Sequence, residues 1–521
     1  MRTVHKGRGL LIAGMGFCFW LAVPSAAHAD TAGALPFDFN GDGYADLAVG
    51  APSEALGPVA YAGSVNVLYG SATGPTADSS QFWSQRSSGI AGAAEFGDSF
   101  GSAMTSGDFN HDGRADLAVG VVQEKLGADV DSAGAVNVIY GSAAGLSANH
   151  NQVWSQNTPG VPGTAEDFDE FGSRLAAGDF NRDGFADLAV GEWRESVGTV
   201  HQAGMVTVLY GSDSGLRAAG AQFWTQDSPK VVGESEISDQ FGAALAVAEM
   251  TGDDYADLII GVPGENGRGA VQILRGSAAG ITATGSRFWS QASTGVLDRA
   301  ETEDAFGAAL TTGDFNHDGQ ADLAVGSPGE AIVECVECEY QGAVNVLFGS
   351  TVGLTALGNQ FWHIGSVGIP GDPVPGDSFG GSLAAGDFDG DGNSDLSVAA
   401  GIAVNGQTAA GSVFVLRGSN AGLVSTGVVL SQDTPGVPGV AETNEGALQL
   451  AANRYAGGTR DALLIGFPQE SIGSRTNAGA VILVPGSATG LDPSASQLWS
   501  QNSPGVQGVS EESDGFGFVS R

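Results

Sequence analysis

The chain has 521 residues, of which 83 are Gly, 42% are hydrophobic and only 15% are charged. This apolar content argues against extensive disorder, and the frequent Gly favours many turns between short strands over a helical fold. The formal net charge of −39 at pH 7 argues against nucleic acids and anionic lipid surfaces as partners and favours cations.

Residues 1–29 are predicted to be a secretory signal peptide. Arg2, Lys6 and Arg8 form a basic start, "LLIAGMGFCFWLAV" is an apolar core, and "AHA" offers small residues for cleavage. A membrane anchor is the alternative, but the apolar run is short and ends at the cleavage signal. We therefore expect a secreted, extracellular protein without a membrane span, which could remain associated with a cell surface.

The rest of the chain, residues 30–521, contains one unit seven times and is predicted to be a single domain. Each unit has an "FG" pair that starts a strand, an acidic loop, an "ADLAVG" strand, an alternating strand such as "GAVNVIYGS", and an outer strand such as "QVWSQ". Period-2 patterning and Gly-based turns predict four short strands in each unit. The acidic loops start at Asp38, Asp108, Asp179, Glu249, Asp314, Asp387 and Asn453.

The two ends of the repeat array predict a closed ring. The first unit begins almost directly at its acidic loop, whereas the last "FG" pair, Phe516-Gly517, has no acidic loop after it. The final strand would therefore supply what the first unit lacks. We expect an all-β, seven-bladed β-propeller of four-stranded antiparallel blades, closed by a C-terminal strand that completes the first blade. A monomer is expected.

The acidic loop has the pattern D-x-[DN]-x-D-G-x-x-D. Alternate oxygen ligands and a Gly at the sixth position resemble the first part of an EF-hand loop, and such an oxygen-rich cage suits Ca²⁺. Asx-rich turns without metal are the alternative. Five complete loops predict about five Ca²⁺ sites, with a backbone carbonyl at the seventh position of each. The predicted ligands are Asp38, Asn40, Asp42, Tyr44 and Asp46; Asp108, Asn110, Asp112, Arg114 and Asp116; Asp179, Asn181, Asp183, Phe185 and Asp187; Asp314, Asn316, Asp318, Gln320 and Asp322; and Asp387, Asp389, Asp391, Asn393 and Asp395.

Two loops depart from this pattern. The loop that starts at Glu249 has Asp254 where Gly is expected, which predicts a weak site at best. The loop that starts at Asn453 has Tyr455 and Gly457 in ligand positions, so we expect no metal there.

The ordered motif "FG…GDFNxDGxADLAVGxPxE…GAVxVLYG" resembles the FG-GAP repeat of integrin α-subunit propellers and their secreted bacterial relatives. The resemblance implies a seven-bladed propeller with calcium in hairpin loops and ligand contact, in adhesion, on the opposite face. Neither an inserted I-type domain nor leg domains are evident, so integrin signalling is not implied.

The long variable loops opposite the acidic loops are the expected ligand face. They carry Trp193, Arg194, His201 and Tyr340 as candidate ligand-binding residues. Cys335 and Cys338, in "CVEC", are a candidate disulfide, because no further Cys or His is evident nearby to complete a zinc site.

Three sets of repeated residues leave alternatives open. The Asp residues before each "FG" pair and the Glu residues near them could cap turns or form an acidic ring around the channel mouth. The Asp set is Asp98, Asp169, Asp239, Asp304, Asp377 and Asp514, and the Glu residues after the "VG" strands are Glu54, Glu124, Glu195, Glu265 and Glu330. The outer-strand Trp residues could pack between blades or stack on sugars.

The sequence carries no recognised catalytic motif among its few His residues. The predicted function is therefore that of a secreted, calcium-binding, integrin-α-like propeller, a non-catalytic adhesion or recognition module for protein or cell-surface ligands. A carbohydrate-binding propeller lectin is the alternative, and an extracellular hydrolase is a further one. Extracellular protein or glycan ligands are expected as partners.

Overall fold

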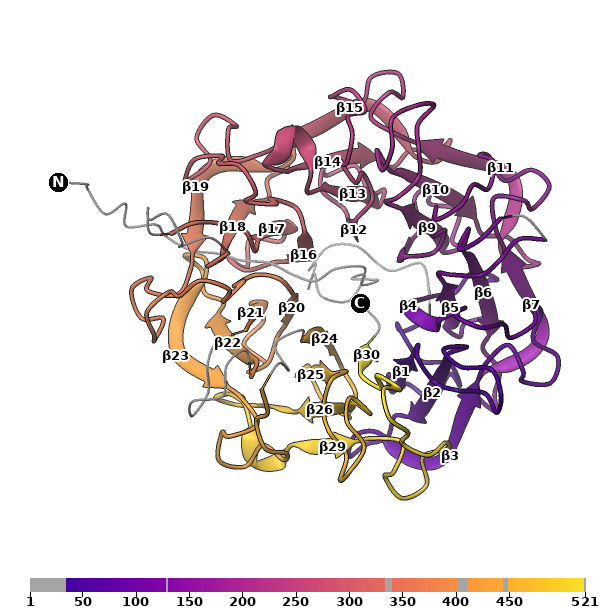
Figure 1. The fold of residues 1–521 in the computed structure, drawn as a ribbon. Coiled ribbons are helices and arrows are strands. Elements are labelled where there is room, and N and C mark those ends of the chain that lie inside the picture. The colour runs from indigo at the N-terminus through magenta and orange to yellow at the C-terminus, as the bar shows by residue number, and fades with distance from the viewer. Residues whose placement is uncertain (1–33, 128–129, 333–339, 402–409, 444–447, 520–521) are drawn as a thin grey trace.

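The computed structural model describes residues 34–127, 130–332, 340–401, 410–443 and 448–519. Within these residues the chain is all-β, with two short 3₁₀ helices, η1 (Glu265–Gly267) and η2 (Pro493–Ala495). Seven four-stranded antiparallel sheets stand around a central axis (Figure 1). The predicted seven-bladed β-propeller is confirmed.

Some predictions concern other parts of the chain. The predicted signal peptide, residues 1–29, and the predicted disulfide between Cys335 and Cys338 lie outside the described residues. Across the described ranges, none of the helices has the length and hydropathy needed to span a bilayer.

Each blade runs from an inner strand near the axis to an outer strand at the rim (Figure 1). Blades 1 to 3 are β30 (Phe518–Val519), β1 (Leu47–Ala51), β2 (Ser64–Tyr69) and β3 (Thr76–Trp83); β4 (Phe100–Gly107), β5 (Asp116–Val121), β6 (Ala135–Tyr140) and β7 (Ser147–Trp154); and β8 (Arg174–Gly178), β9 (Asp187–Glu192), β10 (Met205–Tyr210) and β11 (Arg217–Trp224).

The remaining blades repeat this order. Blades 4 to 7 are β12 (Ala244–Ala248), β13 (Asp257–Val262), β14 (Ala270–Arg275) and β15 (Thr282–Trp289); β16 (Ala309–Gly313), β17 (Asp322–Ser327), β18 (Ala343–Phe348) and β19 (Thr355–Trp362); β20 (Leu383–Gly386), β21 (Asp395–Ala400), β22 (Ser412–Arg417) and β23 (Val424–Leu430); and β24 (Gln449–Asn453), β25 (Ala462–Phe467), β26 (Ala480–Val484) and β29 (Gln497–Trp499). A two-stranded ribbon, β27 (Gly486–Ser487) and β28 (Gly490–Leu491), lies outside the blades.

The C-terminal strand closes the ring. β30 pairs antiparallel with β1, with Val519 opposite Val49 and Phe518 opposite Gly50. Closure therefore brings both ends of the repeat array into blade 1 and supplies its inner strand, as the sequence predicts. A closed ring leaves only short, protected sheet edges.

The "FG" pair forms the junction between neighbouring blades. The Phe residues of the six described pairs are fully buried: Phe100, Phe171, Phe241, Phe306, Phe379 and Phe516. The Gly residues lie against a Gly of the preceding blade, because a Cβ on Gly120 would lie 2.3 Å from the carbonyl oxygen of Gly172. Among the described pairs, the prediction that the pair starts a strand holds only in blade 2, where β4 begins at Phe100. In blades 3 to 6 the pair precedes the inner strand, because it serves contact between blades rather than the ladder within one.

The core consists of hydrophobic clusters between adjacent sheets. One cluster combines Val136 and Val138 of blade 2 with Leu175 and Val190 of blade 3. The second strands are covered on both faces, so that every residue of β5 is buried, as expected where sheets pack against each other. The outer-strand Trp residues belong to these clusters or pack against them: Trp83, Trp154, Trp224, Trp289, Trp362 and Trp499.

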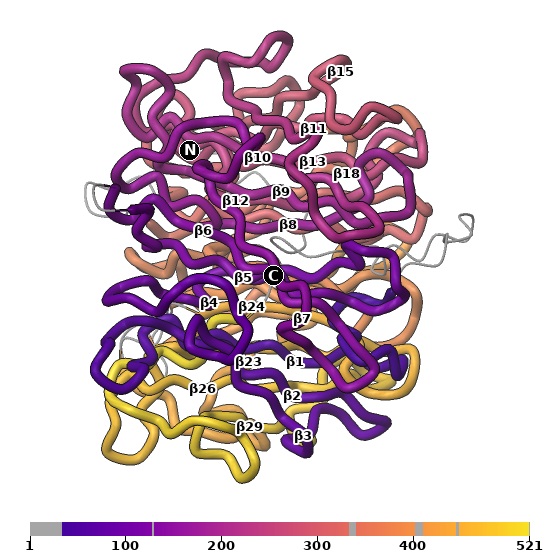
Figure 2. Tube along the Cα trace, turned by 90° about the vertical axis from the view of Figure 1, so that its right-hand side faces the viewer, coloured from indigo at the N-terminus to yellow at the C-terminus, as the bar shows by residue number. Residues whose placement is uncertain are grey.

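Antiparallel order within a blade gives the ring two faces, which the edge-on view in Figure 2 separates. Connections from first to second strand, which carry the acidic loops, lie on one side, here called the acidic-loop face. Connections from second to third strand and from one blade to the next lie on the other side, here called the opposite face.

Candidate metal centre and the opposite face

The acidic loops turn between the first and second strands of a blade. In blade 2 the loop starts at Asp108, directly after β4, and ends at Asp116, the first residue of β5, which pairs with Gly107. Gly113, at the sixth position, has φ +85°, in the left-handed region that favours Gly. The first and ninth positions are therefore fixed by the strands, and the residues between them form a tight turn.

Backbone amides orient the ligand side chains within the loop. Asp108 Oδ1 accepts the N–H of Asp112 at 3.0 Å and its Oδ2 accepts that of Gly113 at 2.9 Å. Asn110 Oδ1 accepts the N–H of Asp112 at 2.9 Å, and Asp112 Oδ1 accepts that of Arg114 at 3.0 Å. The same bonds occur in the loops of blades 1, 3 and 5. The side-chain oxygens of the first, third and fifth positions are thus held by one folded loop backbone.

The ninth position connects three strands. Asp116 is fully buried; its Oδ2 accepts the N–H of Phe109 at 3.0 Å, and its Oδ1 accepts the N–H of Gly141, just after β6, at 2.9 Å. Equivalent bonds recur at Asp46, Asp187, Asp257, Asp322 and Asp395. Each carboxylate oxygen has about two acceptor sites, so one site on each remains for another partner.

Burial makes these carboxylates costly to ionise. Desolvation raises the pKa of Asp46 to about 8 and that of Asp395 to about 8, even though backbone N–H groups favour the charged forms. Burial also raises the pKa of Asp116, Asp187 and Asp322, and the neighbouring loop carboxylates add repulsion. A cation among them would offset both effects, and a donor set made only of oxygens suits Ca²⁺.

The loop of blade 6 brings its carboxylates closest together. Asp387, Asp389 and Asp395 each place an oxygen so that all three lie within 4.8 Å of one another. Its third position is Asp389 instead of Asn, which adds a fourth carboxylate to the loop. Arg417, the last residue of β22, forms ion pairs with Asp389 and, at 3.4 Å, with Asp391. The donor set fits a metal ion, and a basic side chain already contacts part of it.

The loop of blade 4 is arranged differently. Glu249 Oε1 accepts the N–H groups of Thr251 and Gly252 at 2.7 and 2.6 Å, so this longer side chain folds over its own loop. Asp254, in place of Gly, has φ +69° and pairs with Arg182 of blade 3 at 2.6 Å. The strained sixth position and its ion pair with Arg182 distinguish this loop from the complete ones.

In blade 7 the ligand pattern is replaced by packing. Tyr455, at the third position, is buried in the cluster between blades 7 and 1. Asp461, at the ninth position, accepts the N–H of Asp387 in blade 6 at 2.9 Å. The loop therefore contributes a core aromatic and a contact between blades.

Adjacent acidic loops are bonded to each other. The carbonyl oxygen of Asp108 accepts the N–H of Ala186 in the next loop at 3.0 Å. His111 and His317, at the fourth loop positions, bond through Nδ1 to the carbonyl oxygens of Gly184 and Gly392 in the following blades, at 2.5 and 2.7 Å. Adjacent acidic loops thus position one another through hydrogen bonds.

On the opposite face, the Asp residues before the "FG" pairs cap turns. Asp169 Oδ2 accepts the N–H of Glu166 at 2.5 Å, and Asp377 Oδ2 accepts that of Val374 at 2.7 Å. The other four repeat this bond: Asp98, Asp239, Asp304 and Asp514. Turn capping accounts for this set, which is buried rather than displayed as an acidic ring.

A contact that sequence reasoning missed joins neighbouring blades here. The Gln of each "WSQ"-type segment donates its Nε2–H to the buried Glu of the next blade, as Gln85 does to Glu124 at 2.6 Å. We call this pair the Gln–Glu latch. Among the described residues it recurs as Gln156–Glu195, Gln226–Glu265, Gln291–Glu330, Gln432–Glu470 and Gln501–Glu54. Burial raises the pKa of Glu124 to about 7 and that of Glu330 to about 9.

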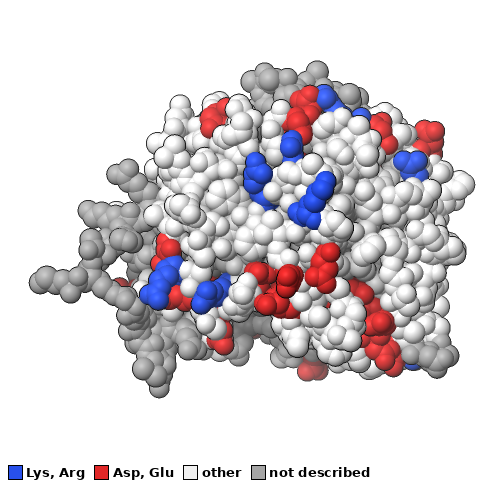
Figure 3. Space-filling model, turned by 90° about the horizontal axis from the view of Figure 1, so that it is seen from above, with Lys and Arg blue, Asp and Glu red and all other residues white. Residues whose placement is uncertain are grey.

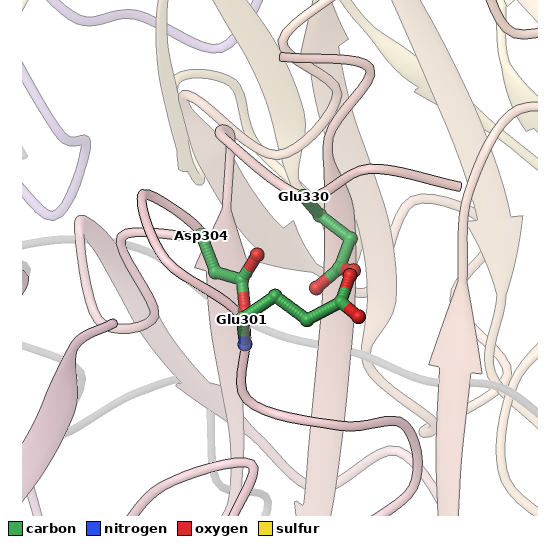
Figure 4. Close-up of side chains that lie close together, drawn as sticks. All are labelled: Glu301, Asp304 and Glu330. Atoms are coloured by element: carbon green, nitrogen blue, oxygen red, sulfur yellow. The ribbon is translucent and has the colours of Figure 1, made fainter. Parts of the chain in front are cut away.

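One latch has further carboxylates beside it. Glu301, Asp304 and Glu330 come from two loops of blade 5 and point toward one another (Figure 4), with oxygens within 4.8 Å. Gln291 donates to Glu330 at 2.5 Å, and the backbone of Glu301 donates to Asp304. Latch and turn cap thus explain two of the three carboxylates.

The predicted ligand-binding residues fall into two separate places. Trp193 and Arg194 lie on a blade 3 loop, where the guanidinium stacks 4.7 Å from the ring centroid and pairs with Glu170 at 3.2 Å. His201 is exposed on the same loop, with its Nδ1 3.4 Å from Ser196 Oγ. Tyr340 belongs to blade 5, where its hydroxyl donates to Glu303 at 2.8 Å. The structure does not bring these four residues into one site.

Sequence reasoning also missed exposed apolar residues on the opposite face. Phe96 is 77% exposed and Tyr61 is 47% exposed, and their rings meet edge to face at 5.8 Å. Phe168 and Ile237 are exposed on the equivalent loops before blades 3 and 4. Their signal was a recurring apolar residue three or four positions before the "FG" pair.

Comparison with known proteins agrees with this architecture. The FG-GAP repeat model matches residues 31–68, 100–139, 171–209, 241–274, 306–347 and 379–416, which lie in blades 1 to 6. Phosphatidylinositol-glycan-specific phospholipase D of Rattus norvegicus is 34% identical over 170 residues, 32% of this chain and 19% of the relative. Integrin alpha-3 of Mus musculus is 28% identical over 196 residues, 35% of this chain and 17% of the relative.

Integrin alpha-PS2 of Drosophila melanogaster is 28% identical over 273 residues, 49% of this chain and 17% of the relative. The matched stretches thus span less than a fifth of each of these relatives. Among solved structures, a putative 6-phosphogluconolactonase from Bacteroides fragilis matches 90% of this chain and 96% of its own, with 10% identity and a TM-score of 0.42. With six FG-GAP repeats set in a seven-bladed ring, and with integrin α relatives, this chain is an FG-GAP repeat β-propeller protein.

Proposed function

We propose that this protein is a secreted, calcium-binding, non-catalytic adhesion or recognition module. In this proposal Ca²⁺ occupies the five complete acidic loops and stabilises one face of the ring. The opposite face contacts an extracellular protein or cell-surface ligand, and the chain works as a monomer. The observation that carries the proposal is the repeated set of buried loop carboxylates, which have backbone N–H partners but a raised pKa.

The chemistry of the loops supports calcium in particular. Asp and Asn side chains are hard oxygen donors, and the seventh-position residues Tyr44, Arg114, Phe185, Gln320 and Asn393 would add one carbonyl each. Ca²⁺ takes six to eight oxygens in a flexible geometry, which a hairpin loop can supply together with water. The ion would neutralise buried charge and fix the ends of two strands.

The opposite face favours a protein ligand over a sugar. Exposed Tyr61, Phe96, Phe168 and Ile237 offer apolar contact area on loops of neighbouring blades, and such clusters on a soluble protein mark interaction surfaces. The outer-strand Trp residues, which could have been sugar platforms, are in the core at Trp154 and Trp362 and are partly buried against it at the other positions. Charged side chains on the rim seen in Figure 3 form small separate groups among uncharged surface, so one large charged patch does not dominate that side.

A binding experiment tests this assignment. The protein is immobilised and exposed to extracellular matrix and cell-surface protein fractions, with calcium or with EDTA, beside the double variant Tyr61→Ser/Phe96→Ser. We expect a protein to be retained by the wild type in calcium and lost from the double variant, which keeps its calcium. Retention that is unchanged in the double variant, or capture of glycans alone on a glycan array, would contradict the proposed ligand face.

A further inference from the structure

The third strands of blades 1 to 6 end in two kinds of residue, whereas that of blade 7 ends in Val484. In blades 1, 2, 3 and 5 the last residue is aromatic: Tyr69, Tyr140, Tyr210 and Phe348. In blades 4 and 6 it is an arginine, Arg275 at the end of β14 and Arg417 at the end of β22 (Figure 1). The same position in the fold therefore carries a hydrophobic ring in four blades and a positive charge in two.

Both arginines contact the acidic loop of their own blade. Arg275 Nη2 lies 3.1 Å from Thr251 Oγ1 and 2.5 Å from Asp253 Oδ2, the third and fifth loop positions. Arg417 pairs with Asp389 and with Asp391 at 3.4 Å, which are the same two positions. Both guanidinium groups therefore contact the third and fifth loop positions, whose oxygens the calcium proposal assigns to the ion in the complete loops.

Other arginines near the loops have a different arrangement. Arg217 approaches Asp183 at 3.9 Å and Arg114 approaches Asp112 at 3.7 Å. Each of these ion pairs involves one carboxylate, at the fifth position, and leaves the third-position Asn to the loop backbone. Contact with the third and fifth positions together is thus a property of the two strand-end arginines.

Blade 6 differs from the other complete blades at two positions, Asp389 and Arg417, whose side chains contact each other. The other complete loops have Asn at the third position and three carboxylates, whereas blade 6 has Asp389 and four carboxylates. The Asp389 side chain is buried, and Arg417 supplies one positive charge against it. Arg417 therefore offsets the charge of the additional carboxylate in this loop, and it does so with donors that stand in for a metal ion.

We propose that Arg417 is a built-in counter-ion of the blade 6 loop that competes with Ca²⁺, and that Arg275 neutralises a blade 4 loop that binds no metal with or without it. The proposal rests on the proposed calcium function. Arg417 is 44% exposed, and a partly exposed ion pair is weak, so a divalent ion can displace it. Blade 6 is then the site that fills last, as calcium rises above the level that fills blades 1, 2, 3 and 5.

Blade 4 differs because we expect no divalent ion to displace Arg275 from its loop. The Glu249 carboxylate is bonded to the amides of its own loop, and Asp254 pairs with Arg182. Removing Arg275 would therefore leave a loop without the Gly turn, with Asp254 still paired to Arg182. Arg275 neutralises a loop that has lost its metal, whereas Arg417 regulates one that keeps a complete donor set.

Calcium titration calorimetry of the full protein without its signal peptide tests the competition. We expect four tight sites and one weaker site in the wild type. Arg417→Tyr, which restores the residue of blades 1 to 3, should tighten the fifth site by roughly fivefold, the effect of removing one exposed ion pair. Arg275→Tyr should add no site, and Arg217→Gln should leave the binding curve unchanged.

Melting in EDTA provides a second readout that does not require a gain of affinity. Arg417→Tyr should melt lower than wild type in EDTA, because four carboxylates lose their counter-ion, and should show a larger rise in melting temperature on adding calcium. Arg417→Lys should behave like the wild type. Calcium binding that Arg417→Tyr weakens or leaves unchanged would overturn the inference alone, whereas a wild type that binds no calcium would overturn the proposed function itself.

Discussion

The two faces of the ring bury carboxylates in different ways. On the acidic-loop face, the described contacts of Asp116 come from the backbone, through the amides of Phe109 and Gly141. On the opposite face, Glu124 accepts a side-chain amide, from Gln85 of the preceding blade. Both faces look equally acidic in the sequence. The difference is that the loop carboxylates, which we propose as metal ligands, are held by amides of their own blade, whereas the latch Glu residues accept a neutral donor from a neighbouring blade.

Removing calcium should give the largest difference between the two faces, because it should destabilise the acidic-loop face. With five sites at calcium about a hundredfold above the dissociation constant, the ions would together contribute on the order of 10 kcal/mol to the free energy of unfolding. We expect EDTA to lower the melting temperature by about 10 °C or more. Calorimetry with and without EDTA measures this, with refilling by CaCl₂ as the control. A melting temperature that EDTA leaves unchanged would contradict the difference between the faces.

The pH dependence of the free energy of unfolding should also distinguish the carboxylates of the two faces. Burial raises the pKa of Asp46 to about 8, of Glu124 to about 7 and of Glu330 to about 9 in the folded chain, above the usual value near 4 in an unfolded chain. The folded state therefore holds more protons, so in EDTA stability is greatest below about pH 4 for these groups and falls as pH rises toward 9.

Calcium should reverse part of that trend. Ions bind the deprotonated loop carboxylates, so stability in saturating calcium should fall less steeply with pH than in EDTA, and only the latch Glu residues should keep their contribution. Melting curves from pH 4 to 9 in both conditions check this. Parallel curves would show that the loops do not exchange protons for ions.

The latch can be broken without touching the loops. Gln85→Leu removes the amide that Glu124 accepts, and leaving a buried acceptor unpaired costs about 1–3 kcal/mol. Denaturant unfolding should show a loss of that size, while calcium binding remains as in wild type. Gln81→Leu, in the outer strand β3 that precedes Gln85, is a matched control, because Gln81 bonds Tyr69 and Leu146 and not the latch. A loss of calcium in Gln85→Leu would mean that the two faces are not independent.

The smallest change concerns one charge in one loop. Asp112→Asn keeps the Oδ1 acceptor for the Arg114 amide and removes a ligand charge at an exposed position. We expect the affinity of that site to fall roughly tenfold with little change in stability in EDTA. Glu95→Gln, on the opposite face, should leave all sites unchanged. Titration calorimetry distinguishes the two variants.

Much of the fold could be predicted because the sequence repeats one structural unit along the chain. Seven acidic loops and an unpaired last "FG" pair predict the ring and its closure, and β30 confirms it. The ligand spacing likewise predicts the loop hairpin, since the first and ninth positions flank the turn. The sequence did not show that "FG" serves contact between blades, because this depends on the close approach of Gly120 and Gly172 across the junction.

Contacts between blades and strand ends escaped prediction for a physical reason. Gln85 and Glu124 are separated by 39 residues, and neither residue looks unusual in its own loop. Arg417 ends a third strand, 26 residues from Asp391, and its role is visible only once the end of the strand and the loop lie side by side. Such pairs are set by how repeats pack, which local pattern does not encode.

The central claim is that the buried carboxylates of the acidic-loop face bind Ca²⁺ and that those of the opposite face do not. Equilibrium dialysis of the purified protein, followed by metal analysis and repeated with Asp116→Ala, Asp187→Ala and Asp322→Ala, counts the ions and locates them. The account predicts about five Ca²⁺ per chain, with one fewer in each variant. Fewer than two ions in the wild type, or a count that these three substitutions leave unchanged, would contradict it.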